Sequence, residues 1–380
     1  MSSRSVLASL SGPNGLRVAE QLRLFTSTAQ RSAPITHFTP CSAPAIDGTL
    51  DHIRNKIILP SYLPEGQQKK LRSPKWEKKL QADPITIEID GKLEKFRYMN
   101  PLKDIPNARK LLLTAVNSFQ TQADFANFQP LMTGLLHARK FNDSFFCLLI
   151  RVMGDKGQIY QIIELARSVK RSGFKLNTPE KAFKVLGYCS MKAQGAGYAE
   201  PDTRQALLWA EMVVEMLHDN AHQPIREQRG QLFEGELPLK RDPLAMATPL
   251  HLAAEIATKY GNDDAILEKV RKYATDIVRL WPEGKKVTEI QPQAVYNIKV
   301  PKSVATKTHN FLQAHSEFLA MMAPLQRGLN QAAKLVEPEL ASKLQTRADL
   351  LAAEIQERRR LSKGQRGEDI LKKFNPETLT

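Results

Sequence analysis

Helical patterning that recurs about every 35 residues constrains this chain more than any other feature. Residues 143–177 hold two stretches whose apolar residues are spaced by three and four, joined at a short turn that contains Gly154 and Gly157. The same outline precedes this segment in residues 108–142 and follows it in residues 178–218. One helix pair cannot bury its own apolar face, so three successive pairs predict an array in which each pair stacks on the next. The helices expected in the three segments cover 108–118 and 124–138, 144–153 and 159–171, and 182–192 and 203–217.

A second group of helices is expected beyond a polar loop at about residues 219–243. Gly261-Asn262-Asp263 separates two stretches of helical spacing, and Pro282-Glu283-Gly284 ends the second of them. In order, the expected elements are helices over 244–260 and 264–281, loop or short strand over 285–303, and helices over 304–322 and 336–362. The helical part thus divides into repeats at 107–218, further repeats at 244–330, and a basic helix with a polar tail at 331–380.

The start of the chain has the composition of a targeting segment. Residues 1–40 contain four arginines, no lysine and one acid, Glu20, among many serines and threonines. An arginine-rich, serine-rich and acid-poor start that can form an amphipathic helix is typical of a mitochondrial transit peptide. We therefore predict a transit peptide over residues 1–32 and a location in the mitochondrial matrix.

Two different structures are expected between the predicted transit peptide and the first helix pair. Residues 33–83 are rich in proline and poor in periodic apolar positions, which predicts an extended, irregular and basic arm. In residues 84–98, Ile85 and Ile87 alternate with polar residues before Asp90-Gly91, a dipeptide typical of tight hairpin turns. This second segment is predicted to form a small β-hairpin.

Residues 143–177 also resemble a pentatricopeptide repeat. Phe146 stands where the motif has its first-helix aromatic residue, Gly157 falls at the inter-helix turn, and residues 170–175 are similar to the basic end of the motif. Residues 182–211 are equally similar to a tetratricopeptide-like or Sel1-like pair. All of these families are α-solenoids, so the resemblance implies an all-α fold of stacked helix pairs.

The resemblance also implies a mode of RNA binding. Pentatricopeptide repeats bind single-stranded RNA, and one first-helix residue together with the last residue of the repeat reads a base. The matching positions here are Cys147 with Asn177, and Leu112 with Asn142. Leu112 and Cys147 depart from the polar residue that the family uses, which favours recognition of shape and phosphate over the reading of individual bases.

The charge balance points to anionic partners. The chain has 55 basic and 40 acidic residues, a net charge of +15 that suits phosphate polymers, acidic proteins or anionic membranes. Trp76 lies within a lysine-rich stretch and is a candidate for stacking on a base or for anchoring the arm in a protein groove. Each basic run also has the simpler interpretation of a solvated surface. The candidate RNA contacts are Arg139, Lys140, Arg151, Lys170, Arg171 and Lys175 in the repeats, Lys75, Lys78 and Lys79 beside Trp76, and Arg358, Arg359, Arg360, Lys363 and Arg366 near the C-terminus.

Signatures of catalysis are not evident in the sequence. The glycine-containing turns lack the P-loop pattern. His218 and His222 have no third metal ligand nearby and are expected to lie at a solvent-exposed helix end. Cys147 and Cys189 lie in apolar helices, where we expect buried thiols. The sequence therefore predicts neither an enzyme nor a bound cofactor, metal or small-molecule substrate. It also predicts no membrane span, because apolar runs such as 145–150 are too short.

Together these patterns predict an α-solenoid in mitochondria that binds RNA or ribonucleoprotein during mitochondrial gene expression. Basic extensions on a helical body are similar to those of many mitochondrial ribosomal proteins, including fungal ones, so a place in the mitochondrial ribosome is expected. RNA binding would depend steeply on salt, and glutamine in place of the basic residues at 358–366 would flatten that dependence. The alternative is a protein-binding scaffold, such as an assembly factor for a respiratory complex.

Overall fold

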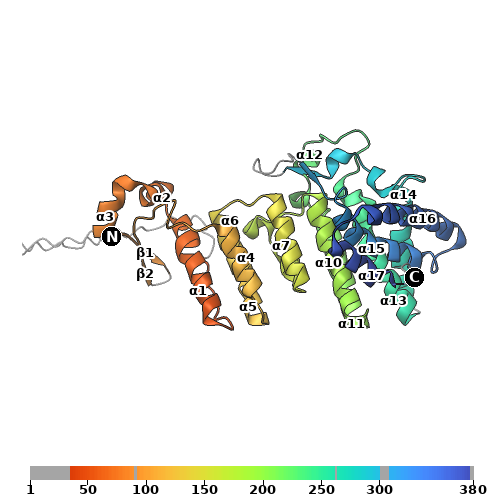
Figure 1. Ribbon diagram of the computed structural model, residues 1–380, viewed down its shortest axis with the longest axis horizontal. Coiled ribbons are helices and arrows are strands. Elements are labelled where there is room, and N and C mark those ends of the chain that lie inside the picture. The colour runs from red at the N-terminus through yellow and green to blue at the C-terminus, as the bar shows by residue number, and fades with distance from the viewer. Residues whose placement is uncertain (1–34, 90–91, 262, 300–307, 377–380) are drawn as a thin grey trace, which may run out of the picture. The chain divides into compact units, whose positions relative to one another are not determined.

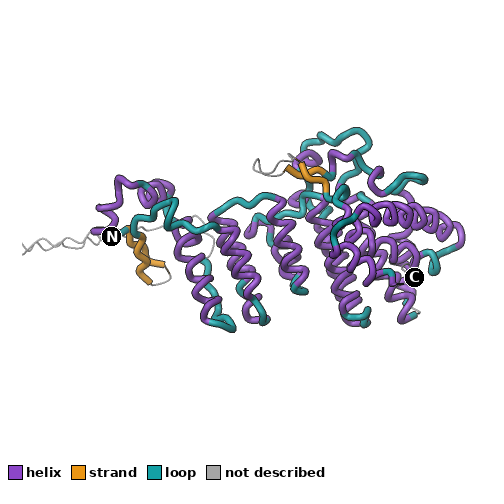
Figure 2. The backbone as a smooth tube through the Cα atoms, viewed as in Figure 1, coloured by secondary structure: helices purple, strands orange, loops and turns teal. Residues whose placement is uncertain are grey.

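The computed structural model describes residues 35–89, 92–261, 263–299 and 308–376, most of which are helical (Figures 1 and 2). The predicted transit peptide at residues 1–32 lies outside the described residues. None of the helices in the described part of the chain combines the length and apolar character needed to cross a membrane.

The segment that precedes the hairpin is helical, which corrects the prediction of an irregular arm for residues 44–82. Pro44, Pro60 and Pro74 each lie at the first or second position of a helix. Proline is compatible with the first turn of a helix, where its missing N–H would have no partner, so these prolines begin helices here. The elements are α1 (Pro44–Ile53), the π-helical η1 (Arg54–Ile58), the 3-10 helix η2 (Leu59–Tyr62), α2 (Glu65–Arg72), η3 (Pro74–Trp76) and α3 (Glu77–Ala82).

The predicted hairpin is confirmed. β1 (Ile85–Ile89) pairs antiparallel with β2 (Lys92–Phe96), and Ile85 lies opposite Phe96. The hairpin and the end of α2 cover a small apolar core of their own. That core consists of Leu59, Leu63, Leu71, Phe96 and Met99.

The helices predicted at 108–218 are present, with two interruptions. The second helix of the first segment is divided at Asn127, whose side-chain amide donates to the backbone oxygen of Thr39 in the N-terminal segment. Glycines with positive φ stand at two of the turns, Gly157 at 72° and Gly173 at 69°, as their positions in the sequence suggest. The elements are α4 (Ala108–Ser118), α5 (Gln122–Ala126), α6 (Phe128–Ala138), α7 (Asp143–Asp155), α8 (Ile159–Arg167), α9 (Val169–Ser172), α10 (Pro179–Gly195) and α11 (Glu200–Met216).

Successive helix pairs contact one another directly. α7 contacts α4 on one side and α10 on the other, while α8 contacts both α6 and α11 (Figure 1). The predicted apolar face of α8 is buried, since Ile159, Ile162 and Ile163 are each at most 1% exposed. First helices thus pack against first helices and second helices against second helices across this part of the chain.

The C-terminal part keeps most of the predicted helices and adds structure that the sequence did not indicate. The predicted helix at 304–322 is wrong in position, because residues 308–310 form a strand and the helix begins at His315. The polar tail contains a further helix, α17. The elements are η4 (Asn220–His222), α12 (Ile225–Gln228), η5 (Leu239–Arg241), α13 (Pro243–Tyr260), α14 (Asp264–Leu280), η6 (Val287–Glu289), η7 (Gln293–Val295), β3 (Asn297–Lys299), β4 (Thr308–Asn310), α15 (His315–Ala332), α16 (Pro338–Leu361) and α17 (Gln365–Phe374).

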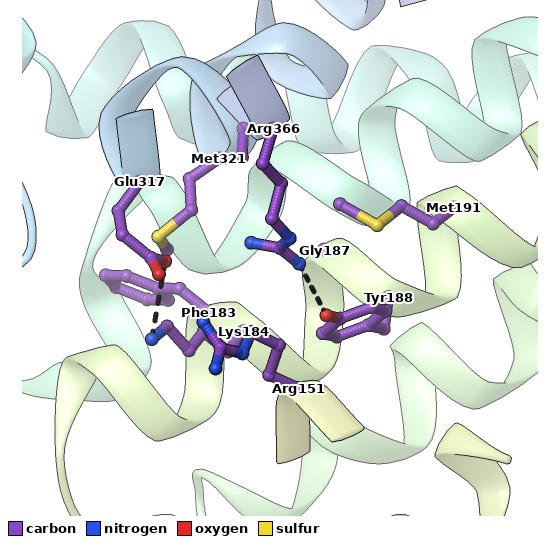
Figure 3. A pocket seen from close by; sticks show the side chains of 10 residues that line it. Arg151, Phe183, Lys184, Gly187, Tyr188, Met191, Glu317, Met321 and Arg366 are labelled. Atoms are coloured by element: carbon purple, nitrogen blue, oxygen red, sulfur yellow. Dashed lines mark hydrogen bonds and ion pairs between the residues drawn. The ribbon is translucent and has the colours of Figure 1, made fainter. Parts of the chain in front are cut away.

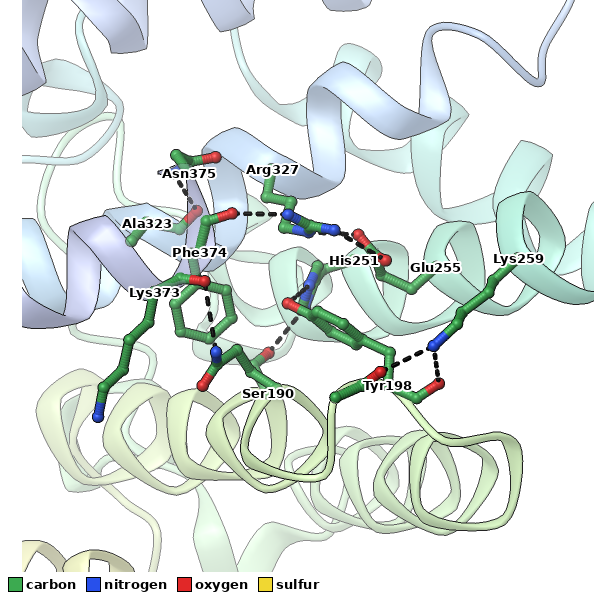
Figure 4. A network of polar contacts seen from close by, with 12 residues as sticks. Ser190, Tyr198, His251, Glu255, Lys259, Ala323, Arg327, Lys373, Phe374 and Asn375 are labelled. Carbon is green, nitrogen blue, oxygen red and sulfur yellow. Dashed lines mark hydrogen bonds and ion pairs between the residues drawn. The ribbon is translucent and has the colours of Figure 1, made fainter. Parts of the chain in front are cut away.

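A buried polar network joins α10, α13, α15 and α17 (Figure 4). The two ring nitrogens of His251 lie 3.1 Å from the hydroxyl of Ser190 and 3.2 Å from that of Tyr198. Arg327 forms an ion pair with Glu255, and its guanidinium also donates to the backbone oxygen of Phe374 at 2.7 Å. Burial lowers the pKa of His251 to about 3, so the imidazole is neutral in the folded protein at neutral pH.

Candidate functional site

Five basic side chains gather on the connections between successive helix pairs, and we call them the connector cluster. Two of them follow the end of α6, and three lie at or just after the end of α9. Because α6 contacts α9, the two connections are neighbours in space. All five side chains are exposed, and all five are among the RNA contacts predicted from the sequence. The connector cluster consists of Arg139, Lys140, Lys170, Arg171 and Lys175.

The charge of the connector cluster is not neutralised within the described part of the chain. None of its members forms an ion pair with a described acidic residue. Lys170 and Arg171 belong to the last turn of α9, where the partial negative charge of the helix end favours cations. No ion pair has to be broken before these side chains meet an anion, so the cluster can contact phosphates directly.

The positions that the resemblance assigns to base reading are used for packing and helix capping. Cys147 is 3% exposed and Leu112 is fully buried. Burial raises the pKa of the Cys147 thiol, which agrees with the predicted buried thiol. The side chain of Asn142 accepts a hydrogen bond from the backbone N–H of Phe145 and so caps α7. These positions leave no accessible pair of side chains for the reading of a base.

Asn177 has a comparable structural role. Its side-chain oxygen accepts a hydrogen bond at 2.6 Å from Lys181, whose ammonium group also forms an ion pair with Asp143 at 2.6 Å. Asn177 thus links the start of α10 to the start of α7. The sequence shows an amide at the end of the repeat, but it does not show that Lys181 donates a hydrogen bond to this amide.

Arg151 lies apart from the connector cluster, in a cleft lined by residues of α7, α10, α15 and α17 (Figure 3). Lys184 on the facing helix forms ion pairs with Glu180 at 2.7 Å and with Glu317 at 3.3 Å. Arg366 also reaches this cleft. Arg151 is half-buried, has no acidic partner among the described residues, and lines this cleft.

The lysines near Trp76 are exposed, and we call Lys70, Lys75, Lys78 and Lys79 the arm cluster. The ammonium groups of Lys70 and Lys79 lie 4.8 and 5.3 Å from the centre of the Trp76 ring. Cation–π contacts of this kind hold the lysines over the indole. A base that stacks on the face of Trp76 covered by a lysine has to displace that lysine, while all four lysines remain able to contact phosphate.

The C-terminal basic residues are divided between internal contacts and the surface. Arg366 donates to the hydroxyl of Tyr188 at 2.7 Å and pairs with Asp155 at 3.3 Å. Arg359 pairs with Glu368 at 2.9 Å, and the guanidinium of Arg358 lies 5.2 Å from the centre of the Phe318 ring. Arg360 and Lys363 are exposed and have no acidic partner in the described part of the chain.

The histidine at the end of the third segment is part of the core. His222 is 2% exposed, and its Nδ1 atom accepts a hydrogen bond from the backbone N–H of Leu176 at 3.0 Å. The sequence favours an exposed helix end for His218 and His222, and the structure corrects this for His222. The described residues contain no group of three or more side chains arranged to hold a metal ion.

Two comparisons with known proteins bear on this arrangement. Residues 23–374 match the family model described as mitochondrial ribosomal protein mS27, or Mrp13. The chain is also 31% identical over 370 residues to the small ribosomal subunit protein mS27 of Neurospora crassa, a match that covers 93% of this chain and 90% of that protein. Helices and basic connections alike fall within the matched residues. The chain therefore belongs to the mitochondrial ribosomal protein mS27 family.

Proposed function

We propose that this mitochondrial ribosomal protein acts in the small subunit of the mitochondrial ribosome, in the matrix, and binds ribosomal RNA through its connector and arm clusters. The observation that carries the proposal is the family match over residues 23–374, because it places the exposed and unpaired cations on a ribosomal protein. Ribosomal RNA is a dense array of phosphates, and each phosphate that a lysine or arginine neutralises adds affinity through release of counterions.

We propose further that the helix pairs stack into an α-solenoid that carries the connector cluster on its connections. The contacts of α7 with α4 and α10, and of α8 with α6 and α11, support this arrangement. The buried positions of Cys147 and Leu112 favour binding by phosphate and shape over base-by-base reading. In this proposal the protein makes and breaks no covalent bond and needs no cofactor.

RNA binding by the purified full-length protein tests the proposal. The probe is a labelled single-stranded RNA of about 20 nucleotides, titrated at several salt concentrations. A triple variant, Lys170→Gln, Arg171→Gln and Lys175→Gln, is expected to reduce the slope of log affinity against log salt by about 2, since each phosphate contact on a single strand contributes about 0.7.

A matched control removes the same charge elsewhere. Lys272, Lys285 and Lys334 are exposed and lie outside both clusters, and their triple replacement by glutamine should leave most of the slope intact. Equal loss in the two triple variants would mean that net charge alone attracts RNA. Failure of the wild-type protein to bind RNA at low salt would contradict the RNA-binding part of the proposal.

The alternative of a protein-binding scaffold for a respiratory complex has less support. The family match names a ribosomal protein, and it spans the helices on which such a scaffold would depend. Sedimentation with a respiratory complex, and not with a ribosomal particle, would favour the alternative.

A further inference from the structure

The connector cluster meets the N-terminal segment where α6 ends. η2 contacts α6 directly, and α2 begins three residues after η2. The end of α2 is fixed in place, because Leu71 is fully buried in the small apolar core and its backbone oxygen accepts a hydrogen bond from Met99. Two segments far apart in the sequence, η2 and α6, therefore lie side by side.

An aromatic stack marks this place. The rings of Tyr62, at the end of η2, and His137, in the last turn of α6, have centroids 4.5 Å apart and planes inclined by 22°. Tyr62 is half-buried, whereas His137 is exposed. Tyr62 thus supports the imidazole from within, while His137 keeps ring surface in contact with solvent. A supported, solvent-facing ring is the kind of surface on which an unpaired base stacks.

Two arginines belong to the segments that meet here. Arg72 is the last residue of α2, and Arg139 follows the last residue of α6 by one. Burial lowers the pKa of the Arg72 guanidinium, and repulsion by the positive charge of Arg139 lowers it further. Neither has an acidic partner within the described part of the chain. A bound phosphate would relieve this repulsion and accept hydrogen bonds from both groups.

We propose that Arg72, Arg139 and the ring of His137 form a binding site for one unpaired nucleotide of RNA. The guanidinium groups hold a backbone phosphate, and the base stacks on the imidazole that Tyr62 supports. The site rests on the proposed function, because it names where and how part of the RNA binds. It differs from the rest of the connector cluster in requiring a base that is not paired.

The test compares single-stranded with duplex RNA on the full-length protein. His137→Ala removes the stacking surface, and it should weaken binding of a single-stranded 20-nucleotide RNA about tenfold without a change in salt slope. The same variant should bind an RNA duplex as the wild type does, because paired bases are not free to stack. His137→Phe keeps a flat ring and should restore single-strand affinity, which separates loss of stacking from loss of folding.

The arginines are tested separately. Arg72→Gln with Arg139→Gln should reduce the single-strand salt slope by about 1.4, from two lost phosphate contacts. Arg229→Gln with Arg241→Gln removes the same charge from exposed residues of the 219–243 loop and should leave the slope close to that of the wild type.

The outcomes distinguish this site from the proposed function as a whole. The nucleotide site is refuted, and general RNA binding stands, if the wild type binds RNA but His137→Ala leaves the affinity for single-stranded RNA unchanged. The same conclusion follows if the two double arginine variants have equal salt slopes. If the wild type binds no RNA at low salt, both proposals fail. If His137→Ala weakens duplex and single strand equally, the imidazole does not stack on a base and this site is likewise refuted.

Discussion

At the scale of single residues, the buried imidazole of His251 should make stability depend on pH. The pKa of His251 is about 3 in the folded protein, against 6.5 when it is exposed in the unfolded chain. The unfolded state therefore takes up a proton that the folded state does not, and this contribution to stability is complete above pH 6.5 and is lost as the pH falls toward 3. The hydroxyl of Tyr198 lies 3.2 Å from the ring, and the positive charge of Arg327, which is paired with Glu255, adds to the effect of burial in lowering the pKa of His251.

We predict that wild-type protein loses about 2 kcal/mol more stability than His251→Gln between pH 7 and pH 5. Glutamine can still bond the hydroxyls of Ser190 and Tyr198 but does not titrate in this range. Urea unfolding of both proteins at the two pH values measures the difference, and all other titrating groups are common to both. If the free energy of unfolding falls by the same amount in both proteins, His251 is protonated, or exposed, in the folded protein.

At this scale, the sequence could not reveal which residues form hydrogen bonds and ion pairs with the polar side chains. The sequence identifies Arg366 as a basic residue in a basic run, but its partners Asp155 and Tyr188 are 211 and 178 residues away. Asn142 likewise has the residue type of a base-reading position, and the structure uses it to cap α7. Burial of Cys147 and Cys189, by contrast, follows from the apolar helices around them and was predictable.

At the scale of elements, two glycines on neighbouring helices should respond in opposite ways to alanine. A Cβ atom on Gly154 in α7 would come within 3 Å of the Tyr188 ring, which hydrogen bonds to Asp155 and Arg366 hold in position. A Cβ atom on Gly187 in α10 would meet nothing within 4 Å. The close approach of α7 to α10 therefore depends on the first glycine and not on the second.

We predict that Gly154→Ala destabilises the protein by about 1–3 kcal/mol through overpacking. Gly187→Ala should instead stabilise it by up to about 1 kcal/mol, because alanine loses less backbone entropy in a helix. Chemical unfolding of the two variants gives both values. Equal effects of the same sign would mean that α7 and α10 do not meet at Gly154.

The last helix should contribute to the stability of the whole C-terminal part. Phe374 in α17 is 1% exposed, its ring lies 5.5 Å from that of His251, and its backbone oxygen accepts from Arg327. We predict that Phe374→Ala costs about 3–5 kcal/mol, the usual cost of emptying such a site. The exposed neighbour Lys373 provides the control, since Lys373→Ala should change stability by less than about 0.5 kcal/mol.

Thermal or urea unfolding compares these two variants with the wild type. A Phe374→Ala protein as stable as the control would show that α17 is detached in solution. That result would also agree with the sequence-based prediction that the end of the chain is a polar tail and not a packed helix.

Elements whose signal is local were predicted well, and elements that depend on distant partners were not. The apolar spacing in α7 and α8 and the alternation in β1 are visible within a dozen residues. Helix α17 carries few apolar residues, and it packs closely on α15 at Gly367, where a Cβ atom would meet the backbone of Ser316. The strand at 308–310 similarly depends on pairing with residues 297–299, so the local helical pattern there was misleading.

At the scale of the whole molecule, the surplus positive charge is used in two ways. Near the C-terminus, Arg359 and Arg366 form ion pairs that hold α17 in place. On the connections after α6 and α9, the cations have no described acidic partner and face solvent. The net charge of +15 predicts an anionic partner, but only the structure separates cations that fix the fold from cations that are free to bind RNA. Glutamine at 358–366 should therefore affect folding as well as the salt slope.

Sedimentation of a mitochondrial lysate through a sucrose gradient can verify the claim that this protein belongs to the small subunit of the mitochondrial ribosome. The tagged full-length protein should migrate with the intact ribosome and the free small subunit when magnesium is present. After magnesium is removed and the subunits separate, it should migrate with the small subunit alone. Recovery at the top of the gradient under both conditions, or with a particle that contains no ribosomal RNA, would contradict the claim.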